Sequence, residues 1–110
     1  MQNTTTIDLN EARTSPKAIV FAGRERGRYW RGRFKLDQLD ALPDPVTVII
    51  PADVISLNIS FFLNLFGESV RRLGRDLFVK HYKFVSDPIL EPMISQGIDQ
   101  ALKQSHALTE

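Results

Sequence analysis

Residues 46–50, Val-Thr-Val-Ile-Ile, constrain the fold more than any other part of the chain. Four of the five residues are apolar and all are β-branched, and the run lies between Pro45 and Pro51. β-Branched residues favour strands, and proline interrupts regular pairing on either side. A nearly continuous apolar run is typical of a strand that is buried on both faces of a parallel or mixed sheet. We therefore expect a buried strand here.

Other segments predict further strands and helices. Residues 18–21 form a short apolar run that ends at Ala22-Gly23, residues 78–85 show partial alternation, and residues 4–9 are expected to add an edge strand. A helix is expected between residues 24 and 39. A last helix is expected to begin at about Asp87 or Glu91, each followed by proline, and to end near Gln104.

The clearest helix is expected over residues 59–73. Its apolar residues recur at three- and four-residue spacing, which places them on one helical face. They are Ile59, Phe62, Phe66, Val70 and Leu73. Arg71 and Arg72 suit the negative end of the helix dipole, and Gly74 suits the closing position. Asn58 or Ser60 is expected to cap the start.

The order of these elements predicts an α/β fold, with a small mixed sheet of about four strands and helices packed on it. A length of 110 residues fits a single domain. Residues 1–15 are expected to form an edge strand or a flexible arm, and residues 105–110 a tail. The chain has no apolar run of about 18 residues and no signal-peptide pattern, which favours a cytoplasmic protein without a membrane partner.

Several kinds of chemistry find no residues to support them. The chain has no cysteine, which excludes disulfides, thiolate metal sites and cysteine nucleophiles. It also has no G-x-S-x-G motif, and no pair of carboxylates stands out. His81 is expected to be half-buried in a strand, and His106 to lie in the tail. We therefore expect no catalytic residue, no metal site and no cofactor.

Positive charge is concentrated between Arg24 and Lys35, where six basic residues accompany one acidic residue. The stretch Gly23–Gly27 follows a predicted strand, a place where helix amides can hold an anion. One interpretation is a tight turn followed by a solvated basic face. The other is a contact with nucleic-acid phosphate, with Tyr29 and Trp30 as stacking groups. The candidate anion contacts are Arg24, Arg26, Arg28 and Arg31.

Two large apolar residues fall outside the main stripe of the helix over residues 59–73. At 100° per residue, Phe61 lies roughly 140° and Leu65 roughly 100° from the centre of that stripe. A neighbouring element can cover such residues. Alternatively, they can anchor a protein partner, because exposed apolar groups mark interaction surfaces.

Residues 51–67, Pro-Ala-Asp-Val-Ile-Ser-Leu-Asn-Ile-Ser-Phe-Phe-Leu-Asn-Leu-Phe-Gly, resemble a bacterial STAS-like family of domains of unknown function. The family has a strand that leads through a Ser-rich turn into a helix. It is similar in architecture to the STAS domains of anti-sigma-factor antagonists, which bind ATPase-fold kinases and are switched by serine phosphorylation. The resemblance implies a non-enzymatic regulatory module with a protein partner, for which an ATPase-fold kinase is a candidate.

The antagonists carry Asp-Ser-Ser-Gly at this turn, and the corresponding residues here are Asn58, Ile59, Ser60 and Phe61. Isoleucine therefore occupies the position of the phosphorylated serine. A phosphorylation switch would have to use Ser60 or Ser56, and we take Ser60 as the candidate acceptor. The expected partner surface has Phe61 and Leu65 as anchors and Ser56, Asn58 and Ser60 as its polar rim. The alternative function is nucleic-acid binding by residues 24–35.

Overall fold

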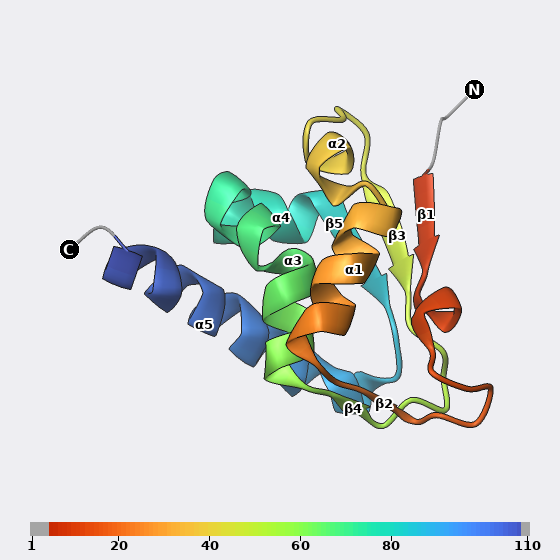
Figure 1. Ribbon diagram of the computed structural model, residues 1–110. Coiled ribbons are helices and arrows are strands. Elements are labelled where there is room, and N and C mark those ends of the chain that lie inside the picture. The colour runs from red at the N-terminus through yellow and green to blue at the C-terminus, as the bar shows by residue number, and fades with distance from the viewer. Residues whose placement is uncertain (1–4, 109–110) are drawn as a thin grey trace.

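The computed structural model describes residues 5–108, with side chains described through residue 104. In chain order the elements are β1 (Thr5–Asp8), the 3-10 helix η1 (Leu9–Ala12), β2 (Val20–Phe21), α1 (Arg24–Arg33), α2 (Leu36–Asp40), β3 (Val46–Ile49), β4 (Ser56–Leu57), α3 (Ile59–Leu73), α4 (Arg75–His81), β5 (Tyr82–Val85), the 3-10 helix η2 (Pro88–Leu90) and α5 (Glu91–Leu108). The predicted α/β class is confirmed. Figure 1 shows the helices on one side of the main sheet, with α3 between α1 and α5.

The strands form two separate parallel sheets instead of one mixed sheet of about four strands. The larger sheet has the order β1-β3-β5, and β2 pairs with β4. In the larger sheet Val48 is the Cα partner of Ile7 on one side and of Phe84 on the other. The predicted edge strand near the N-terminus and the central position of residues 46–49 therefore agree with the structure.

The larger sheet has one well-covered face. Val46 and Val48 of β3 are fully buried, whereas the alternate residues Thr47 and Ile49 are only half-buried. The expectation that this strand is buried on both faces was therefore wrong. The covered face meets a cluster of aromatic rings with centroids 5.2–6.5 Å apart. The rings belong to Phe62, Phe66, Phe78, Tyr82 and Phe84.

Helix α3 has the predicted boundaries. The Asn58 side chain caps its start by accepting a hydrogen bond of 2.9 Å from the Ser60 amide. Gly74 ends the helix with φ of 81°, a conformation that glycine adopts without the strain of a Cβ atom. Helix α3 packs most extensively on α1 and α5, so it is the central helix of the fold.

Three predicted boundaries were wrong. Residues 75–81 form α4, and the strand expected over 78–85 begins only at Tyr82, so His81 ends a helix. Phe78 and Tyr82 are buried, but Lys80 between them is exposed, whereas a strand would place all three side chains on the same face. Helix α5 continues through Leu108 in place of a tail from residue 105, and the His106 side chain lies outside the described residues. The helix expected over residues 24–39 is divided at Lys35, whose φ is 57°.

Candidate functional site

The turn from β4 into α3 brings the three predicted polar residues together. Ser56 belongs to β4, Asn58 is the N-cap of α3, and Ser60 lies in its first turn. The Ser60 hydroxyl donates a hydrogen bond of 2.7 Å to the Asn58 side-chain oxygen. Asn58 is exposed, and the two serines are half-buried. The predicted polar rim is therefore present at the surface.

The two predicted anchors are buried, which corrects that part of the prediction. Phe61 is 0% exposed and Leu65 is 1% exposed. Helix α1 covers this flank of α3, and the Phe61 ring stacks on Phe21 with centroids 5.2 Å apart. A Cβ atom at Gly27 of α1 would lie 2.6 Å from the Phe61 carbonyl oxygen, so the two helices cross at close range. A glycine inside a helix, at position 27, is the sequence signal for this crossing.

Other apolar residues are exposed around the same turn. They are Ile19 (42%), Val20 (46%), Ile55 (50%) and Ile59 (41%). The Ile55 amide donates a hydrogen bond of 2.9 Å to the Ile19 carbonyl, and Val20 pairs with Ser56. Figure 1 shows β2 and β4 side by side, each leading into a helix. We name this the β4–α3 surface: Ile19, Val20, Ile55 and Ile59 together with Ser56, Asn58 and Ser60.

Sequence analysis missed these four apolar residues as surface residues. The spacing of Ile59 places it on the core stripe of α3. It is, however, the first residue of the helix, and the buried residues of α3 begin only at Phe61. Ile19 and Val20 fall in the short apolar run over residues 18–21, which predicts a strand but does not show which side chains are exposed. Within residues 5–108, β2 and β4 pair only with each other, and Val20 on this two-residue ladder stays exposed.

The four candidate anion contacts do not form one face. Arg24 and Arg28 are exposed, and Arg28 donates a long hydrogen bond of 3.4 Å to the Asn64 side chain. Arg26 donates to the Ala12 carbonyl, which ties α1 to the end of η1. Arg31 is buried, with 8% of its side chain exposed. Arg26 and Arg31 are therefore held by contacts within the fold, whereas Arg24 and Arg28 stay exposed.

Arg31 lies at the centre of an ion-pair network that joins four elements. It donates to the Leu65 carbonyl at 2.8 Å, to the Ser69 hydroxyl at 3.0 Å and to Asp37 at 2.7 Å. Asp40, whose side chain is 1% exposed, accepts from Arg31 at 3.4 Å, from Arg72 at 2.7 Å and from the Tyr82 hydroxyl. The network thus connects α1, α2, α3 and β5.

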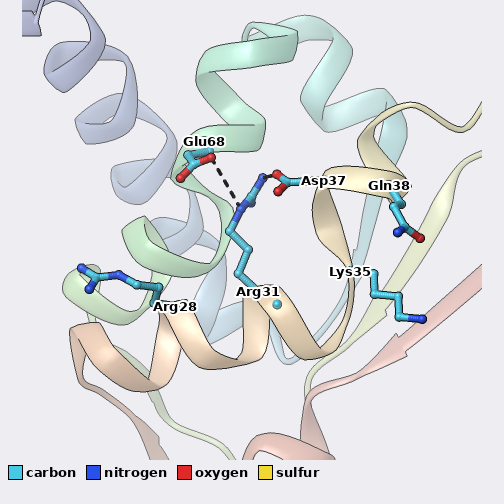
Figure 2. A pocket seen from close by; sticks show the side chains of 7 residues that line it. Arg28, Arg31, Lys35, Asp37, Gln38 and Glu68 are labelled. Atoms are coloured by element: carbon cyan, nitrogen blue, oxygen red, sulfur yellow. Dashed lines mark hydrogen bonds and ion pairs between the residues drawn. The ribbon is translucent and has the colours of Figure 1, made fainter.

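A pocket of about 350 Å³ opens beside Arg31. Figure 2 shows Arg31 pointing toward Asp37 and Glu68, whereas Arg28 and Lys35 extend away on either side. The Arg31 hydrogen bond and positive charge lower the pKa of Asp37 from its ordinary value. Because carboxylates already surround the buried guanidinium, Arg31 itself offers little uncompensated positive charge to an anion. We therefore assign this network a structural role.

Tyr82 gives the network a testable pH dependence. Burial, followed by the hydrogen bond to Asp40, raises the pKa of Tyr82 far above its ordinary value. The phenol of the unfolded chain ionises near pH 10, whereas the folded protein retains the proton. We therefore expect the free energy of unfolding to fall as the pH rises above about 10. Urea unfolding across this range should show a smaller decline for Tyr82→Phe, and equal slopes for the two proteins would contradict the assignment.

Metal binding and membrane insertion find no structural support in the described part of the chain. Within residues 5–108, no three His, Cys, Asp or Glu side chains gather in a way that could hold a metal ion. Over the same residues, no helix combines the length and apolar character needed to cross a membrane.

The chain was compared with models of protein families, with curated proteins and with solved structures. None of the three comparisons found a match.

Proposed function

We propose that the protein is a non-enzymatic regulatory module of the bacterial cytoplasm that binds a protein partner through the β4–α3 surface. The observation that carries this proposal is the exposure of four apolar residues at the paired β2 and β4 and at the first residue of α3, next to a polar turn. Exposed apolar side chains beside a hydrated polar rim are typical of protein interaction surfaces. In this arrangement Ile55 and Ile59 replace Phe61 and Leu65 as the anchors.

The resemblance of residues 51–67 to the STAS-like family supports the same surface and suggests an ATPase-fold kinase as the partner. Ser60 is the candidate acceptor of a phosphoryl group. Its hydroxyl donates a hydrogen bond to the Asn58 side chain, and its carbonyl accepts one of 2.8 Å from the Asn64 side-chain Nδ2. A phosphate here would break the first contact and add about −1.5 to −2 charges at the start of α3. The charge would change the β4–α3 surface that binds the partner, and the positive end of the α3 dipole would stabilise it.

The proposal predicts that Ile59→Asp weakens binding of the specific partner by about 30-fold or more, because a charge would replace an apolar anchor. Partners would be captured from bacterial lysate after nuclease treatment, and the affinity of the purified partner would then be measured. Leu77→Asp is the matched control, because Leu77 is 59% exposed but belongs to α4. Ser60→Asp should also weaken binding. Equal affinities of the Ile59 and Leu77 variants would reject the surface.

Nucleic-acid binding by residues 24–35 is the competing function. Arg24 and Arg28 are exposed cations, and Tyr29, with 59% of its surface exposed, is available for stacking. Phosphate contacts release counterions, so this function requires affinity that falls steeply with salt and a smaller slope in an Arg24→Ala, Arg28→Ala variant. Capture that disappears on nuclease treatment and is unaffected by Ile59→Asp would favour this function over protein binding.

A further inference from the structure

The outer edge of β5 presents unpaired backbone groups. β5 is the last strand of the order β1-β3-β5, so one of its edges faces β3 and the other has no strand beside it within residues 5–108. The Val85 carbonyl faces β3, because it accepts a hydrogen bond of 2.9 Å from the amide of Ile50, the residue after β3. Backbone groups of alternate residues in a strand point to opposite sides, so those of Phe84 face outward. Ser86 directly follows β5, and because the chain is still extended at Asp87 (φ −63°, ψ 139°), the Ser86 groups continue this alternation and face outward as well. Within residues 5–108, no backbone hydrogen bond reaches either pair of outward groups.

A groove of about 310 Å³, lined by both apolar and polar side chains, runs beside this edge between α4 and α5. Val79 is 45% exposed on one wall, Ile94 and Ile98 form the other, and Phe84 of β5 lies at its side. In a strand added to β5, residues opposite Phe84 would point their side chains to the same face of the sheet as Phe84. The groove therefore offers space for side chains of an added strand.

The exposed side chains of Lys83 and Val85 in β5 and of Asp87 just beyond it are complementary in charge and polarity when two copies pair antiparallel. Val85 is 55% exposed and has Lys83 two residues before it and Asp87 two residues after it. In an antiparallel pair centred on Val85, each Lys83 lies opposite the Asp87 of the other strand. The Phe84 and Ser86 backbone groups then satisfy one another, since each Phe84 lies opposite the Ser86 of the other strand.

We propose that a second copy of this chain occupies the β5 edge, so that two β5 strands pair antiparallel about a two-fold axis at Val85. The two three-stranded sheets would join into one continuous sheet. Two Lys83–Asp87 pairs would flank a central Val85–Val85 contact, and the Phe84 rings would border the two grooves. Because β5 lies outside the β4–α3 surface, the dimer and the proposed partner binding can fail independently.

Charge exchange provides the decisive test. In a dimer of the Lys83→Glu variant, a glutamate would face Asp87 in both of the symmetry-related pairs. In a dimer of the Asp87→Lys variant, a lysine would face Lys83 in both pairs. Each change should weaken dimerisation by about 10-fold or more, because like charges directly across a sheet repel. An equimolar mixture of the two variants should form a heterodimer with both attractive pairs restored. Sedimentation equilibrium would measure all four samples, including the unchanged protein.

Amide exchange measured by NMR locates the interface independently of the charges. The Phe84 and Ser86 amides should become protected as concentration rises, whereas the Val85 amide should be protected throughout, since it faces β3. Circular dichroism would verify that the Asp87→Lys variant folds, because Asp87 also accepts a hydrogen bond of 3.0 Å from the Ile89 amide. An unchanged protein that stays monomeric at millimolar concentration would overturn the proposal. So would a dimer that is insensitive to Lys83→Glu.

Discussion

Replacing Gly27 by alanine is expected to lower the free energy of unfolding by about 1–3 kcal/mol, the usual cost of overpacking a core. The new Cβ atom would lie 2.6 Å from the Phe61 carbonyl oxygen and 2.9 Å from the Asn64 Cβ atom. These are atoms of helix α3 at or next to its backbone, so no side-chain rotation can relieve the contact. Helix α1 would have to move away from α3 and expose Phe61 and Leu65.

Gly32 provides the matched control in the same helix. A Cβ atom at Gly32 would have no neighbour within 4 Å, and the residue is exposed. Gly32→Ala should therefore raise the free energy of unfolding by about 0.5–1 kcal/mol, since alanine is the better helix former. Urea unfolding of both variants measures the difference. If Gly27→Ala were as stable as Gly32→Ala, the close crossing of α1 and α3 would be wrong.

Arg31→Met is expected to lower the free energy of unfolding by about 3 kcal/mol or more, which is typical when one partner of a buried ion pair is removed. The methionine would fill much of the volume but would leave the buried Asp40 carboxylate with Arg72 and Tyr82 only. It would also leave the Leu65 carbonyl and the Ser69 hydroxyl without the guanidinium donor.

Arg33→Met is the control, because Arg33 is an exposed residue of the same helix. Its effect should stay within about 0.5 kcal/mol of zero. NMR titration provides a second measurement: the pKa of Asp37, which Arg31 lowers, should rise in Arg31→Met and stay unchanged in Arg33→Met. Equal stabilities of the two variants would show that Arg31 does not hold the network together.

Elements whose signals are local could be predicted from the sequence. The apolar spacing, the Asn58 cap and Gly74 define α3 without any tertiary contact, and the β-branched run defines β3. The boundary between α4 and β5 could not be predicted in this way. Phe78 and Tyr82, four residues apart, share a face in a helix and also in a strand. The helix is distinguished only by the exposure of Lys80, which a strand would place on that same face, and exposure depends on tertiary packing.

The candidate site could be predicted only in part. The positions of its polar residues follow from the local sequence, whereas the exposure of its apolar residues depends on tertiary packing. Asn58 and Ser60 follow from the start of α3, which is local. The burial of Phe61 depends on α1, which lies more than 25 residues earlier in the chain. Arg31 likewise finds Ser69 at a separation of 38 residues, so a pattern of basic residues cannot distinguish it from its exposed neighbours.

The placement of Asp40 has a consequence for how the protein unfolds. A helix of five residues such as α2 is too short to be stable alone in water. Asp40 ends this helix and is held by residues of α1, α3 and β5, so α2 cannot melt without leaving a buried arginine and a buried phenol unsatisfied. The shortest α-helix of residues 5–108 is thereby made part of the cooperative unit, and its opening is coupled to global unfolding instead of local fraying.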